Sequence, residues 1–215
     1  MGRNPVIAID GPAGAGKSTL ARLLAERLGF VYVNTGAMYR AVALLWKETG
    51  EEPEKIARQL DFEMRGDRVF VGERDVTELL YTPEISDLSS RVSTRPGVRR
   101  ALVDLQRAQR EKYPVVMEGR DIGTVVFPDA EVKFYITASS RERARRRKLQ
   151  FNDPRPLEVI EREIKIRDER DSTREDSPLR RAPDAVFIDT TDLSIEEVLK
   201  LMEKFAKEKL KSIIN

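Results

Sequence analysis

The amino-acid sequence predicts an α/β protein built on a five-stranded parallel sheet that is covered by helices on both faces. Five short apolar runs are spaced along the chain, and each is followed sooner or later by a segment with helical periodicity. A glycine-rich loop joins the first run to its helix. At 215 residues, the chain is long enough for one such domain carrying a small insertion.

The apolar runs have the length and composition of buried strands. In the first crossover, leucines recur at helical spacing from Leu20 to Leu28, and a second helix is expected from about Gly36 to Trp46. Strands separated by helices form a parallel sheet that is buried on both faces. The five predicted strands are Val6–Ile9, Val31–Val33, Val115–Met117, Val132–Ile136 and Ala185–Ile188.

Residues 61–90 break this alternation. Three short segments, Phe62–Met64, Arg68–Val71 and Asp75–Thr77, are separated by Gly66-Asp67 and by Gly72. Glycine and aspartate between alternating apolar residues indicate tight turns. We interpret this region as a small antiparallel meander inserted into the main domain.

The composition excludes several kinds of chemistry. The chain has no cysteine and no histidine, so disulfides, thiolate nucleophiles, imidazole bases and His- or Cys-ligated zinc are impossible. Acid–base work must fall to carboxylates or positioned water. Lys plus Arg is 39 against Asp plus Glu at 37, so no global attraction to nucleic acid exists. We expect a soluble, cytoplasmic protein without a membrane partner, since no apolar run approaches spanning length.

The glycine-rich loop matches the phosphate-binding pattern G-x-x-x-x-G-K-[ST] between a buried strand and a helix. Its backbone N–H groups and the helix N-terminus favour phosphate, Lys17 suits the β- and γ-phosphates of ATP, and Ser18 suits Mg²⁺. The predicted ATP-binding residues are Gly11, Pro12, Ala13, Gly14, Ala15, Gly16, Lys17, Ser18 and Thr19.

Other classes of phosphate-loop protein fit less well. A GTPase would need an N-K-x-D motif to read guanine, and the chain has none. Phe187-Ile188-Asp189 resembles the strand of a regulatory or motor ATPase that ends in a metal-holding aspartate. It lies near the C-terminus, so we interpret it as a strand that ends in a turn.

Two arginines lie near predicted helix N-termini, where structure alone favours acidic residues. Arg40 is one turn into the helix for which Thr35 is the predicted N-cap, and Arg99 follows Pro96, which marks the first turn of another helix. Facing an anionic or polar ligand would account for both. The alternative is a solvated surface arginine in each place.

Arg120 and Asp121 follow the third predicted strand, at the sheet edge where α/β proteins bind ligands. Arg120 suits a phosphate group, and Asp121 suits an amino group. The alternative is that the two side chains form a structural pair.

The predicted helix after Pro156 changes character along one face. Leu157, Ile160 and Ile164 form an apolar stripe, and the same spacing continues through Arg167, Asp171 and Arg174. Because uncompensated charge is costly in a core, the stripe is expected to leave the core and enter a polar cleft. The alternative is that the helix ends near Asp171 and these residues are solvated.

The basic run Arg141–Lys148 precedes the loop Asn152–Pro156. Arg143 and Arg147 are four residues apart on one helix face, which suits a mobile lid that places guanidiniums on a transferring phosphoryl group. The alternative is a nucleic-acid patch, although no aromatic residues are interleaved with the charges.

Four segments together resemble the bacterial-type cytidylate kinase family (CMP/dCMP kinases): Ala8–Thr19, Thr35–Arg40, Gly119–Asp129 and Ile166–Asp171. The resemblance spans nearly the whole chain, and the G-R-D-I-G-T-V-V-F-P-D segment is its most specific part. It implies the P-loop nucleoside monophosphate kinase fold with an extra β-containing insert. It also implies that the protein phosphorylates CMP, and also dCMP, with ATP and Mg²⁺. We expect a monomer without nucleic-acid partners. Another acceptor, such as UMP or a small metabolite, stays an alternative.

The resemblance also implies a division of the chain and a set of roles. The core comprises 1–34, 94–140 and 156–215, the monophosphate-binding part is 35–93 with its insert at about 61–90, and the lid is 141–157. Asn34 departs from the family pattern, which commonly has Asp there. For the acceptor, the resemblance implies Ser90, Arg99 and Asp121 as contacts of cytosine, Arg40, Arg120 and Arg174 as contacts of the CMP phosphate, Arg167 and Asp171 as contacts of ribose, and Thr35 and Tyr39 as pocket lining. It implies Arg143 and Arg147 as lid arginines. The residues implied as catalytic are Lys17, Arg120, Arg174 and Arg147.

Overall fold

A computed structural model describes residues 3–214, with side chains described up to residue 211. The chain divides into two compact units, described separately below. The first unit contains the residues up to Val33 and those from Gln109 onward, and the second unit contains Asn34–Ala108. Among the described residues, no helix combines the length and the apolar character that crossing a membrane would require.

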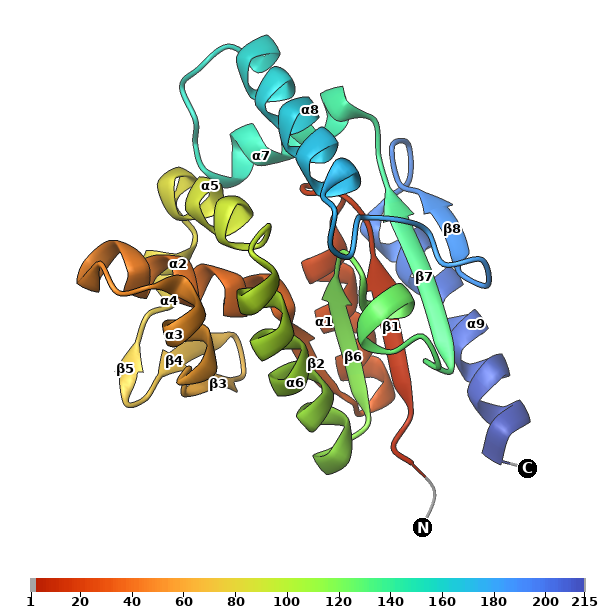
Figure 1. Cartoon of the computed structure of the whole chain (residues 1–215). Coiled ribbons are helices and arrows are strands. Elements are labelled where there is room, and N and C mark those ends of the chain that lie inside the picture. Colours follow the sequence, from red (N-terminus) through yellow and green to blue (C-terminus); the bar gives the residue numbers. More distant parts are fainter. Residues whose placement is uncertain (1–2, 215) are drawn as a thin grey trace. The chain divides into compact units, whose positions relative to one another are not determined.

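The first unit is built on the predicted five-stranded parallel sheet, whose strand order is β2-β6-β1-β7-β8 (Figure 1). All five predicted strands are present: four are extended by one or two residues, and the last is shifted by one. Their bounds are β1 Val6–Asp10, β2 Val31–Asn34, β6 Val115–Gly119, β7 Val132–Thr137 and β8 Val186–Asp189.

Strand β1 lies in the middle of this sheet and pairs in parallel with β6 on one edge and β7 on the other. Its register places Asp10 opposite Gly119 of β6 and Tyr135 of β7. All five β1 residues are buried. The carboxyl ends of β1, β6 and β7 therefore lie side by side, as expected for parallel strands.

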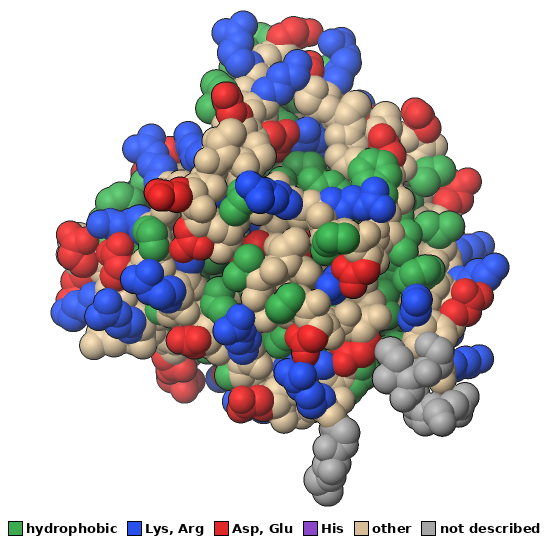
Figure 2. All heavy atoms as spheres, turned by 45° about the vertical axis from the view of Figure 1, so that its right-hand side comes forward, with side chains coloured by type: hydrophobic (Ala, Val, Ile, Leu, Met, Phe, Trp, Pro, Cys, Tyr) green, Lys and Arg blue, Asp and Glu red, His purple; other side chains and the backbone are tan. Residues whose placement is uncertain are grey.

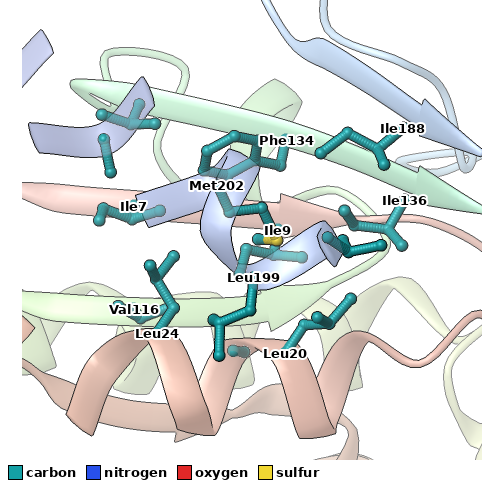
Figure 3. Close-up of a cluster of buried hydrophobic side chains, with 14 of the residues drawn as sticks. Ile7, Ile9, Leu20, Leu24, Val116, Phe134, Ile136, Ile188, Leu199 and Met202 are labelled. Atoms are coloured by element: carbon teal, nitrogen blue, oxygen red, sulfur yellow. The ribbon is translucent and has the colours of Figure 1, made fainter. Parts of the chain in front are cut away.

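The helices of the first unit are α1 Lys17–Leu28, α7 Ser140–Gln150, α8 Leu157–Thr173 and α9 Ile195–Ile214, with the short π-helix η1 Ile122–Val126. Helices α1 and α9 pack against one face of the sheet. There, Ile7 and Ile9 of β1 contact a cluster that includes Leu24 of α1 and Met202 of α9 (Figure 3). This core anchors the start of α1, and with it the end of the phosphate loop.

The second unit contains the predicted antiparallel meander, but the meander is shorter than expected. Its strands are β3 Phe62–Arg65, β4 Arg68–Val71 and β5 Arg74–Asp75, in the order β3-β4-β5. The predicted third strand, Asp75–Thr77, is wrong beyond Asp75, because Thr77 begins a helix. Its helices are α2 Thr35–Thr49, α3 Pro53–Arg58, α4 Thr77–Leu80 and α5 Pro83–Val92, and α6 Pro96–Lys112 runs from this unit into the first.

Charged side chains of both signs are interspersed over the face shown in Figure 2. This agrees with the balanced composition, which gives a net charge of only +2. Like charges are therefore separated by opposite ones on this face, and long-range attraction of a polyanion to it is weak.

Candidate active site

The phosphate loop leaves β1 through a turn that only glycine can make. Gly11 has a φ of 148°, and a Cβ atom at this position would lie 1.9 Å from the carbonyl oxygen of Ile136. The chain therefore passes directly over the backbone of β7 before it enters α1. Because α1 begins at Lys17, its unpaired N–H groups and positive end of the helix dipole face the loop.

Lys17 is buried, and its Nζ atom donates a hydrogen bond to the Pro12 carbonyl at 2.7 Å. Burial lowers the pKa of Lys17 from its ordinary value to about 7, and the positive charge of Arg120 adds to this lowering. An anion bound in the loop would oppose both effects and stabilise the ammonium form. The site therefore favours a phosphate beside Lys17.

Ser18 faces a carboxylate that sequence reasoning left without a role. Its Oγ atom donates to Oε1 of Glu118 at 2.5 Å, and the hydroxyl of Tyr32 donates to the same oxygen at 3.2 Å. Glu118 is buried near the carboxyl end of β6, next to β1. An acidic residue near the carboxyl end of a predicted buried parallel strand was the sequence signal that could have identified Glu118 as a site residue.

Two arginines of the basic run donate hydrogen bonds to backbone carbonyl groups of the phosphate loop. Arg143 donates to both carboxylate oxygens of Asp168 at 3.0 and 2.6 Å, and to the Ala13 carbonyl at 3.1 Å. Arg146, which the sequence analysis did not single out, donates to the carbonyls of Thr190 at 2.7 Å and of Ala15 at 3.4 Å. The loop is thereby fixed through its carbonyl groups, which leaves its N–H groups for a ligand.

Arg147 lies away from this brace. Its guanidinium carbon is 5.8 Å from the centre of the Phe151 ring, at the end of α7. Burial lowers the pKa of Arg147 relative to its ordinary value. The two predicted lid arginines therefore have different surroundings: Arg143 supports the phosphate loop, and Arg147 packs against the loop that follows α7.

Helix α8 persists through the polar part of the stripe. Ile160 and Ile164 are buried against Ala144 of α7, and Asp171 is also buried, two residues before the helix ends at Thr173. The prediction that the stripe keeps its face is thus confirmed as far as Asp171. It is wrong for Arg174, which is the C-cap with a ψ of 142°, because the chain turns extended there.

Asp171 forms an ion pair with Arg120, which follows β6. The Nε atom of Arg120 donates to Oδ2 of Asp171 at 2.9 Å. Burial alone would raise the pKa of Asp171, but the guanidiniums of Arg120 and Arg167 bring it below its ordinary value. The sequence suggested Asp121 as a structural partner of Arg120, and the hydrogen bond from Arg120 to Asp171 was not foreseen.

Arg174 is held by the turn that follows α8. Its Nε atom donates to the carbonyl of Ser177 at 2.7 Å, and its Nη2 atom lies 3.9 Å from Oδ1 of Asp121. Ser177 has a φ of 51°, an uncommon conformation for a residue other than glycine. The first unit thus brings Arg120, Asp121, Asp171 and Arg174 together next to the phosphate loop.

The remaining predicted residues belong to the second unit. Asn34, not Thr35, caps α2, because its side chain accepts from the Ala37 N–H at 3.0 Å. The guanidinium of Arg99 lies 5.7 Å from the Tyr39 ring centre, and that of Arg40 lies 5.4 Å from the Tyr81 ring centre. Both distances lie within cation–π range.

Ser90 and Arg99 are both buried and meet at Ser93. Arg99 donates from Nη1 to the Ser93 carbonyl at 3.2 Å, and the Ser93 hydroxyl donates to the Ser90 carbonyl at 2.8 Å. Tyr39, Ser90 and Arg99 are therefore neighbours within the second unit. Thr35 is buried at the start of α2.

The alternative interpretation of Asp189 as the end of a metal-binding strand is replaced by the expected turn. Asp189 accepts from the backbone N–H of Thr191 at 2.9 Å and from its hydroxyl at 2.6 Å. These two bonds close the turn after β8, as predicted from its place near the C-terminus.

Two solved structures share this arrangement of strands and helices. A gluconokinase from Sinorhizobium meliloti 1021 superposes with a TM-score of 0.53 at 13% identity, covering 100% of this chain and 98% of the other. A shikimate kinase from Bacteroides thetaiotaomicron gives a TM-score of 0.51 at 12% identity, covering 94% and 98%. At such low identity, the likeness defines the fold alone.

Sequence comparison identifies the family within that fold. The sequence profile of the family named Cytidylate kinase matches residues 7–208. A cytidylate kinase from Carboxydothermus hydrogenoformans is 52% identical over 92% of this chain and 95% of its own. One from Thermotoga neapolitana is 46% identical over 96% and 98%. The chain belongs to the cytidylate kinase family, as the sequence motifs predicted.

We predict that Arg143→Ala weakens ATP binding, because the loop loses its brace at Ala13 and Asp168 loses its partner. Losing hydrogen bonds between charged groups should reduce ATP affinity roughly tenfold, measured by calorimetry, and lower the melting temperature by roughly 5 °C. Arg145→Ala on the same helix is the control, since Arg145 is exposed and pairs with Glu142. Equal behaviour of the two variants would contradict the bracing role.

Proposed function

We propose that the protein transfers the γ-phosphoryl group of ATP to CMP, and also to dCMP, giving ADP and the nucleoside diphosphate. The observation that carries the proposal is a set of charges beside the phosphate loop, in which Asp121 and Asp171 are buried and Arg120 and Arg174 are partly buried. A loop for a donor nucleotide alone does not require them. Relatives named cytidylate kinase, 46–52% identical over more than nine-tenths of the chain, support the same reaction.

The donor is held by the phosphate loop. Its N–H groups and the α1 N-terminus bind the ATP phosphates, and Lys17 bridges the β- and γ-phosphates. In this position Lys17 stabilises charge that moves toward the β–γ bridging oxygen during transfer. Arg147, at the end of α7, is assigned to the transferring phosphoryl group.

Ser18 and Glu118 fit the magnesium ion that ATP brings. Mg²⁺ prefers oxygen ligands and is usually held by one or two protein groups together with phosphates and water. The Ser18 hydroxyl and a Glu118 carboxylate oxygen, 2.5 Å apart, form such a set. Among the described residues, no cluster of three or more carboxylates stands ready to hold a metal ion alone. The ion, when bound, neutralises charge on the ATP phosphates.

We assign the acceptor-binding roles as the family motifs imply. Arg40, Arg120 and Arg174 are assigned to the CMP phosphate, since guanidiniums suit phosphate oxygens. Arg167 and Asp171 are assigned to the ribose. The cytosine is assigned to Ser90, Arg99 and Asp121, and the pocket lining to Thr35 and Tyr39.

The reaction needs no strong base. The second pKa of a phosphate monoester is about 6, so the attacking CMP oxygen is already mostly deprotonated at neutral pH. This agrees with a chain that has no histidine or cysteine. Positioning and charge stabilisation by Lys17 and the arginines then supply the rate.

The basic run supports kinase chemistry over nucleic-acid binding. Arg143 is engaged with Asp168, and Arg145 and Arg146 both pair with Glu142. Their charge is partly neutralised within the protein. A monomeric state, a cytoplasmic location and the lack of nucleic-acid or membrane partners stay predictions.

We predict that the wild-type protein releases ADP from ATP in the presence of CMP and dCMP, and much more slowly with UMP, AMP or GMP. Lys17→Ala should lose over a hundredfold in turnover, because it removes a strong transition-state contact worth about 3 kcal/mol or more. A coupled ADP-release assay measures both. Lys200→Ala, an exposed lysine on α9, is the control. Near-normal turnover by folded Lys17→Ala, or turnover of another monophosphate instead of CMP, would contradict the proposal.

We predict that Asp121→Asn narrows the preference for CMP over UMP. A carboxylate accepts from the cytosine amino group, whereas uracil presents a carbonyl oxygen that the carboxylate repels. The variant should therefore lower kcat/KM for CMP. The ratio of kcat/KM for UMP to kcat/KM for CMP should rise. Steady-state kinetics on both nucleotides test this, with Asp104→Asn on exposed α6 surface as the control. An unchanged ratio would show that Asp121 does not read the base.

We predict that Asp171→Ala costs CMP more than dCMP. Both should lose, because Asp171 also holds Arg120, but only CMP has a 2′-hydroxyl that Asp171 can accept from. A hydrogen bond to a charged acceptor contributes about 1.5–3 kcal/mol, so the CMP-to-dCMP ratio of kcat/KM should shift roughly tenfold. Melting curves recorded alongside separate this from general destabilisation. Equal losses on the two nucleotides would leave Asp171 as the partner of Arg120 only.

A further inference from the structure

Asp10 is a buried carboxylate that the proposed reaction leaves without a role. It is the last residue of β1, directly before Gly11 and the phosphate loop. Only 4% of its surface is exposed. Burial raises the pKa of Asp10 to about 7, although two backbone N–H groups and the charge of Lys17 oppose this effect. An asparagine of the same size would avoid the cost of a buried charge, but it would offer only one acceptor oxygen. A carboxylate is favoured here only if both of its oxygens accept hydrogen bonds.

Both oxygens of Asp10 bind the start of η1. Oδ1 accepts from the N–H of Ile122 and Oδ2 from the N–H of Gly123, each at 2.8 Å. These are the first two N–H groups of the helix, which have no acceptor within it. The side chain that caps η1 therefore comes from a residue more than a hundred positions earlier, at the start of the donor loop.

Because Asp10 caps η1, the Asp121 side chain is not needed as the N-cap of this helix. An aspartate immediately before a helix ordinarily turns back to accept from the first N–H groups. The side chain of Asp121 makes no such bond, although it occupies the N-cap position of η1. Its Oδ1 atom instead lies 3.9 Å from Arg174. Asp10 thus takes the capping role, and the Asp121 carboxylate points to the charged cluster.

The approach of η1 to β1 is close and leaves little freedom. A Cβ atom on Gly123 would lie 3.4 Å from Oδ2 of Asp10 and 3.1 Å from Cδ of Lys133. Within the segment, the Asp121 carbonyl accepts from the N–H groups of Val125 at 2.8 Å and Val126 at 3.2 Å. The position of Arg120 and Asp121 is therefore tied to Asp10 by a short, fixed path.

We propose that Asp10 is a positioning residue that holds the Arg120–Asp121 segment beside the phosphate loop, and so contributes to the choice of acceptor base. The inference rests on the proposed function, because it acts through the assigned role of Asp121. Asp10 and the loop that binds the donor are consecutive in the chain. The end of β1 thus fixes both the phosphate loop, through the chain itself, and the Arg120–Asp121 segment, through the Asp10 side chain.

The test is Asp10→Asn, which keeps the size of the side chain but replaces one acceptor oxygen by an NH₂ group facing an N–H donor. We expect kcat/KM for CMP to fall roughly tenfold or more and the CMP-to-UMP ratio to narrow, as for Asp121→Asn. The N–H groups of Ile122 and Gly123 should exchange with solvent faster by NMR. The affinity for ATP should change less than the affinity for CMP.

The matched control is Glu131→Gln. Oε2 of Glu131 accepts from the N–H of Val6 at 2.7 Å, so this carboxylate binds the opposite end of the same strand. It also pairs with Arg110 at 2.6 Å. Glu131→Gln should lower the melting temperature without changing the CMP-to-UMP ratio. If Asp10→Asn behaves in the same way, Asp10 is structural only and the inference is overturned.

A double variant locates the effect. If Asp10 acts through Asp121, Asp10→Asn should change the CMP-to-UMP ratio less than about twofold in an Asp121→Asn background, because coupled residues are not additive. An undiminished effect in that background would overturn the inference. Should Asp10→Asn not fold, Gly123→Ala is the second variant: its methyl group would contact Oδ2 of Asp10 and crowd the Lys133 side chain, and we expect a smaller change in the same direction. An unchanged ratio in a folded Gly123→Ala would then count against the inference.

The wild type and Asp121→Asn distinguish a failure of the proposed function from a failure of the Asp10 role. No turnover of CMP by the wild type, or an unchanged base preference in Asp121→Asn, contradicts the proposed function itself. A clear effect of Asp121→Asn together with a silent Asp10→Asn contradicts only the role of Asp10.

Discussion

Strand β1 constrains everything that happens at the active site. It is hydrogen-bonded on both edges and buried on both faces, so its carboxyl end cannot move without breaking the sheet. From that end the chain delivers Asp10, the Gly11 turn and the phosphate loop within a few residues. The contact of Gly11 with the backbone of β7 leaves room for no side chain, and the direction of the loop follows from it. Arg143 and Arg146 then fix the loop through its carbonyls. The loop is thus arranged before any nucleotide arrives, which reduces the ordering cost of binding.

The second constraint is electrostatic. Several charged groups are buried close together, and each loses hydration that must be replaced. Two ion pairs replace part of this lost hydration: a bidentate pair of Arg143 with Asp168, and a pair of Arg120 with Asp171 through one hydrogen bond. For Lys17, burial and Arg120 lower the pKa more than the nearby Glu118 and Asp10 raise it, so the pKa stays below its ordinary value. A bound phosphate supplies the missing negative charge. The site is therefore complementary to an anion in its resting arrangement, which is the form of preorganisation that phosphoryl transfer requires.

Much of the first unit was predictable because its signals are local. Each strand is a short apolar run, and the phosphate loop has fixed spacing, so periodicity and motif were sufficient. The insert was predicted less well. Thr77–Leu80 and Pro83–Val92 are helical, and Thr82 caps the second of these helices at Ile85. The pair Thr82-Pro83 is a helix-start signal that could have been recognised. Among the site residues, Arg120 and Asp171 are 51 positions apart, and Asp10 and Ile122 are 112 apart. Their pairing depends on the sheet order, which spacing along the chain does not contain.

The pairing of Arg120 with Asp171 also bears on how acceptor recognition is divided. If Arg120 binds the CMP phosphate and Asp171 the ribose, the two contacts share one hydrogen bond and cannot be independent. A change at Asp171 removes a partner that orients Arg120, and a change at Arg120 leaves the buried Asp171 with fewer positive neighbours, Arg167 and Arg174. Removing a partner from a buried pair generally costs more than the pair contributes, because the remaining charge is uncompensated. Sugar and phosphate recognition should therefore be non-additive in this protein. Any attempt to assign a separate binding energy to each residue must measure the double variant as well as the two single ones.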